Sequence, residues 1–295
     1  MIILHTLWKM KIKELPEDFI VEEVMNLHLE EGQYYYYLVT KRNWNTLDLV
    51  HEIAERLHVK DVGYAGIKDR NAVTSQYISV NKKIPFTLKD VTFTFIGTGK
   101  ERIFIGALEG NRFTIIVRDL DKKLKEVKDV VNYFGEQRFS LKNALIGKML
   151  VQKKFKEACT ELELTAEKND YVGALKRIGK DTLRFYVHAY QSELWNRLAA
   201  KSKKKVIPII GYLTEGKDYE KILEEEEVCQ EDFIIRSFPD IGAEGGQRER
   251  IVQVKEFKTL SFTDDELHLG KKKQVISFCL DKGAYATTVI EALSI

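Results

Sequence analysis

The sequence predicts an α+β protein whose sheet is mainly antiparallel. Strand-like alternation of apolar and polar residues recurs over the first 120 residues, and the connections between neighbouring runs are short, as between antiparallel strands. From about residue 142 apolar residues recur at helical spacing in lysine-rich segments, before a last strand-like run and a helix.

The composition suits one large domain or two smaller ones, because 44% of the 295 residues are hydrophobic and 31% are charged. No run of 18 apolar residues occurs, so we expect no membrane span. The apolar start MIILHTLW lacks a small-residue cleavage site and is not a predicted signal peptide. The three cysteines, Cys159, Cys229 and Cys279, lie far apart, which favours reduced thiols in a cytoplasm-like compartment and argues against a zinc site.

The net charge of +2 is too small to indicate a nucleic-acid-binding protein by itself. Local basic clusters are more informative and lie at 122–128, 153–156, 197–205 and 271–273, against an acidic run at 224–227. Such clusters can follow RNA phosphates, although solvated helix faces are the other interpretation.

The first predicted strands cover residues 9–14 and 18–25, with a break at Pro16. Four consecutive tyrosines, Tyr34 to Tyr37, lie in the next strand-like run. A period of two sends two of them to each face; packing in the sheet is the favoured interpretation, and stacking on RNA bases is the alternative. A helix then begins at Thr46, whose hydroxyl can cap it, and shows apolar residues at helical spacing up to residue 57.

Residues 63–80, GYAGIKDRNAVTSQYISV, form a candidate reaction centre. Two glycines there can adopt positive φ and let a ligand approach the backbone. A strand-like run follows, so Asp69 is predicted to lie on a loop that a sheet holds in place. Its neighbours Lys68 and Arg70 favour the ionised carboxylate, which can act as a nucleophile or a base. A hairpin turn with solvated charges is the other interpretation.

Further elements follow in order. Strands are predicted at 91–97, 102–108 and 112–118. A helix from about residue 121 would end at Gly135 and place Asn132 and Phe134 in its last turn. Later helices are predicted at 155–164, 171–179 and 183–200, short strands at 206–213 and 233–238 with an acidic helix between them, and a strand with a helix at 275–293.

Several motifs resemble those of the tRNA pseudouridine synthase D family. The family pattern G-x-K-D-x-x-A-x-T-x-Q, which carries the catalytic aspartate, is matched at every position from Gly66 to Gln76. The pattern N-Y-F-G-x-Q-R-F is matched from Asn132 to Phe139. Further similar segments, in chain order, are Lys13 to Glu23, a K-x-x-x-N-T element ending at Thr46, Gly106 to Phe113, Ala189 to Arg197, Gly245 to Arg250, and Ser277 to Thr287.

The resemblance implies an isomerase that converts uridine to pseudouridine in tRNA, at uridine 13 of the D arm, with no cofactor. It implies that Asp69 is the nucleophile or base that releases uracil from its sugar, and that Lys13 keeps Asp69 ionised. It also implies that Phe134 stacks on the target uracil and that Asn132 positions the loop or the base. The other implied substrate-binding residues are Lys68, Gln137 and Arg138.

The resemblance also implies a catalytic domain made of residues 1–144 and 256–295, with a smaller α/β domain inserted at 145–255. The expected partner is tRNA, with no metal and no membrane, and the sequence leaves the oligomeric state open. Asp281 stands where the family usually has proline, and Glu291 where it usually has a basic residue.

Two alternatives stay open at this stage. The chain could be a non-catalytic RNA-binding protein, although an intact Asp69 with Lys68, Asn132 and Phe134 argues against one. It could also be a pseudouridine synthase for another RNA, because RNA shape and backbone contacts decide which base is chosen.

Overall fold

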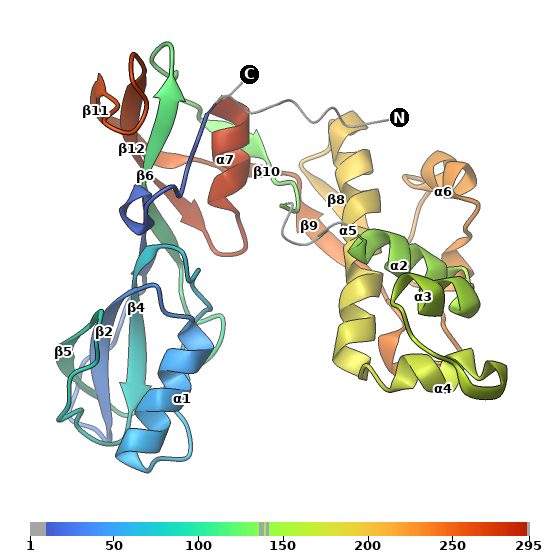
Figure 1. Cartoon of the computed structure of the whole chain (residues 1–295), viewed down its shortest axis with the longest axis horizontal. Coiled ribbons are helices and arrows are strands. Elements are labelled where there is room, and N and C mark those ends of the chain that lie inside the picture. The colour runs from blue at the N-terminus through green and yellow to red at the C-terminus, as the bar shows by residue number, and fades with distance from the viewer. Residues whose placement is uncertain (1–9, 136–138, 140–141, 294–295) are drawn as a thin grey trace. The chain divides into compact units, whose positions relative to one another are not determined.

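The structure is a computed structural model that describes residues 10–135, 139 and 142–293. The chain divides into two compact units, of which unit 1 comprises Met1–Val130 and Gln253–Ile295 and unit 2 comprises Val131–Val252. Unit 1 is therefore built from both ends of the chain, as the blue and red segments of Figure 1 show. The predicted α+β class with a mostly antiparallel sheet is confirmed.

Unit 1 is organised around an eight-stranded sheet in the order β11-β12-β6-β1-β4-β2-β5, with β3 pairing to β4. Its strands are β1 (Phe19–Val24), β2 (Tyr34–Arg42), β3 (Gly63–Tyr64), β4 (Val73–Val80), β5 (Val91–Gly99), β6 (Gly110–Leu120), β11 (Lys255–Asp264) and β12 (Lys272–Asp281). The pair β1–β4 is parallel, and the other pairs in this sheet are antiparallel.

Helix α1 (Thr46–Leu57) covers one face of this sheet through a buried apolar stripe. It is capped by Asn45, whose side chain accepts a hydrogen bond from the Leu47 amide at 3.0 Å, so the predicted cap at Thr46 was wrong by one residue. Unit 1 also contains a short 3₁₀ turn (Pro16–Asp18) and helix α7 (Ala286–Leu293).

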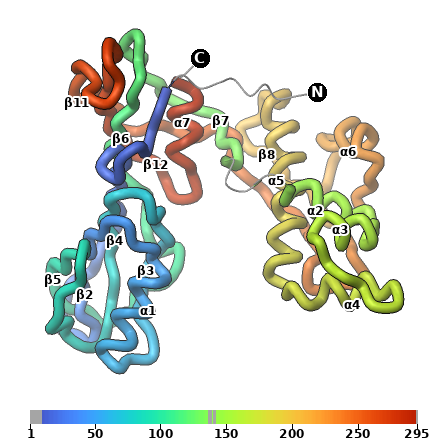
Figure 2. The backbone as a smooth tube through the Cα atoms, in the orientation of Figure 1, coloured from blue at the N-terminus to red at the C-terminus, as the bar shows by residue number. Residues whose placement is uncertain are grey.

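Unit 2 is mainly helical and packs around the long helix α5 (Lys180–Lys201), which buries Trp195 completely. Helix α2 (Asn143–Val151) lies along α5 so closely that a Cβ at Gly147 would sit 2.0 Å from the Tyr186 carbonyl oxygen (Figure 2). The other helices of this unit are α3 (Phe155–Glu161), α4 (Tyr171–Lys176) and α6 (Glu220–Glu226), with 3₁₀ turns at Glu167–Asn169, Gln230–Phe233 and Pro239–Ile241.

Two small sheets accompany these helices. Strand β8 (Val206–Ile209) pairs with β9 (Gly246–Glu249) in an antiparallel arrangement. Strand β7 (Asp129–Val131) pairs with β10 (Ile251–Gln253), and the chain passes between the two units within these strands. In the described part of the chain, the longest apolar helices fall short of what a membrane crossing would require.

The predicted strand at 9–14 was wrong. Its described residues form a single bridge, from Lys11 to Arg118, and no continuous ladder. The reason is local: Lys13 has a φ of 59°, a left-handed conformation that a regular strand does not contain.

The predicted strand at 102–108 was also wrong. The segment turns at Gly106, which has a φ of 91°, and its amides bond outside a ladder. The Ile103 amide donates to Ser79 Oγ at 2.8 Å, so a side chain of β4 replaces a neighbouring strand as its partner.

Two further predictions failed because tertiary contacts override local pattern. Residues 121–135 contain no helix; the Leu124 amide donates to the side chain of Gln274 at 2.7 Å, and Asp129–Val131 forms strand β7. Residues 233–238 are not a strand, because the chain leaves a 3₁₀ turn there with Phe233 fully buried. Strand β11 was not predicted.

Candidate active site

Asp69 lies on the loop of residues 65–72, directly before β4. Strand β4 is an interior strand, since Val73 pairs with β1 on one side and with β2 on the other. The end of the loop that leads into β4 is therefore anchored in the interior of the sheet. Gly63 and Gly66 do not adopt the positive φ that was expected; Gly63 is needed because a Cβ there would lie 2.3 Å from Ser79 Oγ.

The side chain of Lys13 forms an ion pair with Asp69. Its Nζ donates to Asp69 Oδ2 at 2.6 Å and lies 4.0 Å from the centre of the Phe19 ring. The Asp69 side chain is 41% exposed, so the carboxylate is held by a cation and is still reachable by a ligand. A charge-assisted bond of this length also fixes the direction of the carboxylate.

Lys68 does not contact the Asp69 carboxylate. Its ammonium is buried and donates to Glu23 Oε2 at 2.6 Å and to Asn111 Oδ1 at 2.8 Å. Glu23 Oε1 also accepts the Tyr77 amide of β4 at 3.1 Å. This buried ion pair fastens the loop to strands β1, β4 and β6, so Lys68 has a structural position beside the candidate centre.

Lys41 is a site residue that the sequence analysis did not identify. It is fully buried on β2, and its Nζ donates to the Trp44 carbonyl at 2.7 Å, the Asp69 carbonyl at 3.1 Å and the Lys68 carbonyl at 3.5 Å. The pKa of Lys41 is lowered to about 8, mainly by burial; the Asp69 charge partly offsets this lowering and the Lys68 charge adds to it. The signal was present, since Lys41 begins the K-x-x-x-N-T element.

Polar side chains of the matched motifs form hydrogen bonds with the backbone of the same loop. The Lys68 amide donates to Thr46 Oγ1 at 2.9 Å, and this hydroxyl in turn donates to Gln76 Oε1 at 2.9 Å. Gln76 Nε2 then donates to the Gly66 carbonyl at 3.3 Å. Helix α1 and strand β4 thus fix the backbone of the loop directly before Asp69.

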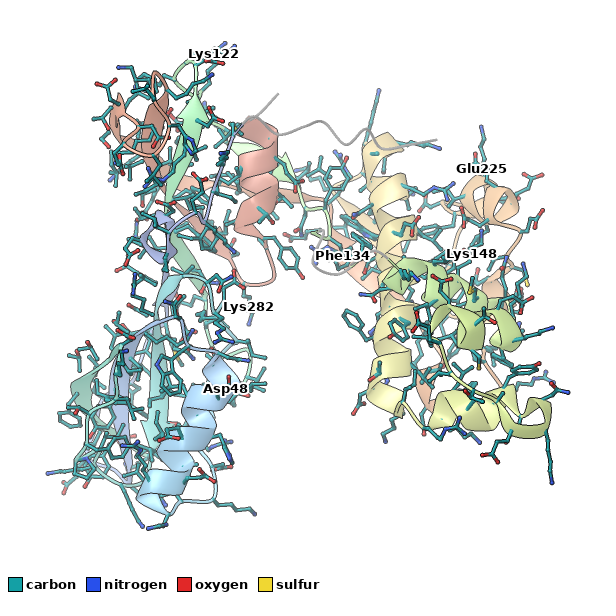
Figure 3. The ribbon with its side chains drawn as sticks, viewed as in Figure 1. Asp48, Lys122, Phe134, Lys148, Glu225 and Lys282 are labelled. Atoms are coloured by element: carbon teal, nitrogen blue, oxygen red, sulfur yellow. The ribbon has the colours of Figure 1, made fainter. Side chains whose placement is uncertain are left out.

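In unit 2, Asn132 and Phe134 share one partner, Arg248 of β9. The Arg248 guanidinium donates to the Asn132 carbonyl at 3.0 Å and to its side-chain oxygen at 2.7 Å. It also lies 4.1 Å from the centre of the Phe134 ring, while Trp195 meets this ring edge-on at 5.4 Å. Phe134, which is labelled in Figure 3, is 8% exposed and borders a cavity of about 500 Å³ within unit 2.

The remaining candidates fall into two groups. Gln137 and Arg138 lie outside the described residues. In the segment Ala189 to Arg197, which resembles the family, Gln191 and Arg197 are candidates for contacts with RNA, but both bond within unit 2: Gln191 to the Ile210 carbonyl and Arg197 to the acidic helix α6. In the described ranges of both units, no three histidine, cysteine or acidic side chains gather closely enough to hold a metal ion.

This fold matches a solved structure of known kind. A crystal structure of the putative tRNA pseudouridine synthase D from Methanosarcina mazei superimposes with a TM-score of 0.78 and 24% identity, covering 96% of this chain and 93% of that one. A probable tRNA pseudouridine synthase D 2 of Methanocaldococcus jannaschii is 29% identical over 96% of this chain and 91% of its own. The tRNA pseudouridine synthase D of Aquifex aeolicus is 34% identical over 63% of this chain and 65% of its own.

A sheet that presents an accessible loop aspartate, together with relatives of this kind, defines an isomerase of the pseudouridine synthase class. The model of the tRNA pseudouridine synthase D (TruD) family matches residues 6–162 and 208–293, so the chain belongs to this family. The resemblance seen in the motifs is thereby confirmed. Its segment Ala189 to Arg197 falls between the two matched ranges.

Proposed function

We propose that this protein isomerises uridine to pseudouridine in tRNA, at uridine 13 of the D arm, with Asp69 as the catalytic residue. The ion pair of Asp69 and Lys13, at 2.6 Å on an accessible loop, is the observation that carries the proposal. Family membership and the tRNA in the names of the relatives support the substrate.

The reaction moves uracil from an N1–C1′ bond to a C5–C1′ bond. The Asp69 carboxylate either attacks C1′ or removes a proton from the sugar, and uracil leaves with the electron pair of the glycosidic bond. The base then turns and C5 forms the new bond to C1′, which either breaks the Asp69–C1′ ester bond and frees the carboxylate or is accompanied by return of the proton from Asp69 to the sugar. The C5 proton is lost, and N1 gains a proton. Atoms and electrons balance within the substrate, so the step needs no external oxidant or reductant.

Lys13 has two proposed effects on this chemistry. Its ammonium pairs with the negative charge of the carboxylate that the reaction requires, and its hydrogen bond orients Oδ2. Lys41 and the buried pair of Lys68 with Glu23 then act as positioning residues, because they hold the loop backbone and leave the carboxylate little freedom.

For Asn132 and Phe134 we propose substrate binding, on the strength of the family motif. The flat ring of Phe134 can stack on uracil, but the Arg248 guanidinium lies over one of its faces. A base would therefore have to stack on another part of the ring or replace Arg248. Phe134→Ala should raise the KM for tRNA, whereas Phe134→Tyr keeps the ring and should stay close to wild type. We propose the same class of role for Gln137 and Arg138.

The roles proposed for the two domains follow the resemblance to the family. Residues 1–144 with 256–295 are proposed as the catalytic domain and residues 145–255 as an inserted domain that contacts tRNA. A cytoplasmic location fits the three free cysteines, Cys159, Cys229 and Cys279, and stays a proposal.

The test uses an unmodified tRNA transcript incubated with wild type or with Asp69→Asn, followed by carbodiimide treatment and primer extension. Asp264→Asn is a matched control, because Asp264 also receives a lysine ammonium at 2.6 Å in unit 1 but lies on edge strand β11. We expect a stop beside position 13 with wild type and Asp264→Asn, and none with Asp69→Asn.

Other outcomes would change the proposal in defined ways. Stops at other uridines would keep the chemistry and replace the site, and stops only in other RNAs would replace the substrate. Tight tRNA binding without any stop from wild type would favour the non-catalytic RNA-binding alternative.

A further inference from the structure

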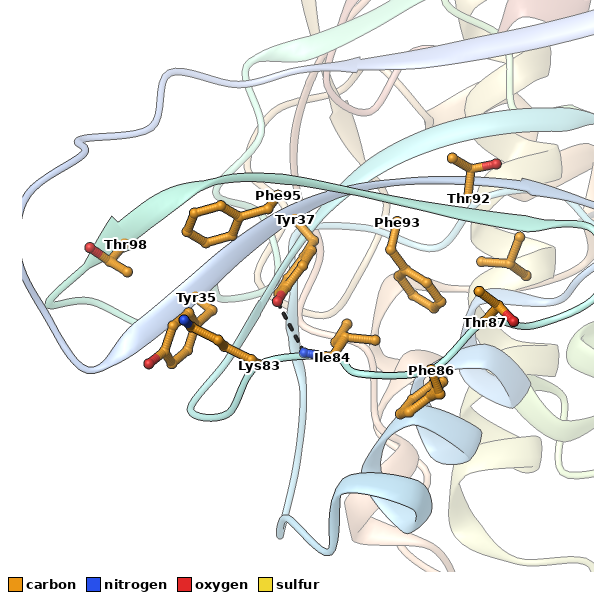
Figure 4. Close-up of a pocket in the computed structure, with 11 residues that line it drawn as sticks. Tyr35, Tyr37, Lys83, Ile84, Phe86, Thr87, Thr92, Phe93, Phe95 and Thr98 are labelled. Carbon is orange, nitrogen blue, oxygen red and sulfur yellow. Dashed lines mark hydrogen bonds between the residues drawn. The ribbon is translucent and has the colours of Figure 1, made fainter.

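A second cavity, of about 800 Å³, lies in unit 1 and takes no part in the chemistry proposed above. Figure 4 shows it between strands β2 and β5 and the segment 81–90 that crosses in front of them. This volume falls in the range of roughly 300 to 1,000 Å³ that small-molecule sites occupy. Two of the four consecutive tyrosines of β2, Tyr35 and Tyr37, line this cavity and have no role in the proposed reaction.

Aromatic residues make up nearly half of this cavity's lining. Five of its residues are aromatic: Tyr35, Tyr37, Phe86, Phe93 and Phe95. Pairing of β2 with β5 explains why they meet, because Tyr37 lies opposite Phe95 in register and Val39 lies opposite Phe93.

The cavity is held open by a defined scaffold. The Ile84 amide donates to the Tyr37 hydroxyl at 3.0 Å, so segment 81–90 is tied across the sheet (Figure 4). Phe95 meets Tyr37 edge-on at 5.5 Å, and Tyr35 lies at a tilt 6.2 Å from Phe95. Phe95 lies on edge strand β5 and is 53% exposed, although it is a large apolar residue. The Phe95 ring therefore lies at the rim of the aromatic cavity, where a ligand can reach it.

The charges of the lining residues indicate which class of ligand the cavity favours. None of the eleven lining residues is acidic, and the charged one among them is Lys83, with its Nζ 5.8 Å from the Tyr35 ring centre. Segment 81–90 carries three lysines against one aspartate. Flat rings next to a cation suit a planar base attached to a phosphate, because any base can stack on them and the cation can meet the backbone.

We propose that this aromatic cavity binds one unstacked base of the RNA substrate, with Lys83 at a neighbouring phosphate. The proposal rests on the proposed function only in taking RNA as the ligand. The site is separate from Asp69: Arg42 pairs with Val73 at the Asp69 end of β4, and Tyr35 pairs with Val80 at the other end. Seven residues of strand span about 23 Å, so the bound base is not the uridine that reacts.

The test compares Phe95→Ala, Phe95→Leu and Lys83→Ala with two matched controls on the opposite edge strand β11. Leu260→Ala removes an apolar side chain that is 56% exposed, and Lys258→Ala removes an exposed lysine. Fluorescence anisotropy gives the Kd for a single-stranded uridine 10-mer and for the unmodified tRNA transcript at several salt concentrations. Circular dichroism melting confirms that each variant is folded.

We expect both Phe95 variants to raise the Kd about fivefold or more, because stacking on an aromatic ring is lost, with no change in the salt dependence. Lys83→Ala should lower the slope of log K against log salt by about one. The two β11 controls should stay within twofold of wild type. At saturating tRNA the single-turnover rate of Phe95→Leu should equal that of wild type, since the cavity lies away from Asp69.

Unchanged affinity of Phe95→Leu and Phe95→Ala for both RNAs would overturn the proposal, as would equal losses in the Leu260→Ala control. A wild-type protein that binds tRNA but forms no pseudouridine would refute the proposed function and leave the affinity comparison valid. Failure of wild type to bind either RNA would overturn the cavity proposal itself.

Discussion

Replacing Lys41 by methionine tests how the Asp69 loop is held. The pKa of Lys41 is lowered from 10.5 to about 8, mainly by burial. This lowering corresponds to about 3 kcal/mol against the charged form. Methionine fits a similar volume without that cost, but it leaves the carbonyls of Asp69 and Trp44 without their donor, at about 1–3 kcal/mol for each buried group left unpaired. Because these effects oppose each other, we expect only a small change in stability at pH 7.

The dependence on pH is the sharper readout. Between pH 8 and 10.5 the unfolded chain keeps the Lys41 proton while the folded chain has lost it, so this group makes stability rise with pH. From pH 7 to 9.5 the contribution is about 2 kcal/mol. The difference in unfolding free energy between wild type and Lys41→Met should therefore shift by that amount in favour of wild type. Urea unfolding followed by circular dichroism at both pH values measures it.

The control for this experiment is Lys82→Met. Lys82 is exposed and also donates to two backbone carbonyls, of Leu57 and His58, so its loss should not create a comparable pH-dependent difference. The activity of Lys41→Met at pH 7 should fall by about 10- to 100-fold, because a loop displaced by about 1 Å misplaces the carboxylate. Parallel pH curves for wild type and Lys41→Met would refute the buried-ammonium reasoning, and activity within twofold of wild type would refute the positioning role.

Two further predictions concern charged groups of unit 1. Lys13→Met should lower the single-turnover rate about 10- to 100-fold with little effect on tRNA affinity. Lys13→Arg should restore part of the rate, because it keeps a cation beside Asp69. A rise in KM without a fall in rate would contradict the role of Lys13 at the carboxylate. Arg118→Met should lower the unfolding free energy of unit 1 by about 3–5 kcal/mol, measured by urea unfolding, because the buried carboxylates of Asp18 and Asp265 lose their shared guanidinium. A decrease in unfolding free energy below about 1 kcal/mol would contradict this stabilising role of Arg118.

Elements with a strong local pattern were predicted well. Alternation predicted β4, β5 and β6, and apolar spacing predicted α1 and α5, because each of these packs one face on a core. The N-terminal boundary of α1 was missed by one residue, since both Asn45 and Thr46 can cap and only the fold places the Thr46 hydroxyl against Gln76.

Segments that depend on distant partners were not predictable in this way. The apolar spacing at 121–135 resembles a helix, but the Leu124 amide bonds to Gln274, 150 residues away. The same limit applies to the site: sequence neighbours suggested Lys68 and Arg70 as the cations beside Asp69, whereas the fold brings Lys13 there from 56 residues away. The family motif indicated Lys13, and periodicity alone did not.

Tritium release from a tRNA transcript made with [5-³H]uridine measures directly whether the Asp69 carboxylate drives the isomerisation. Formation of the C5–C1′ bond expels the label from C5, so each turnover releases it to water. We expect release by wild type and by the Asp264→Asn control, and none above background by Asp69→Asn that still binds the transcript. Release by Asp69→Asn at the wild-type rate would refute a catalytic role for Asp69.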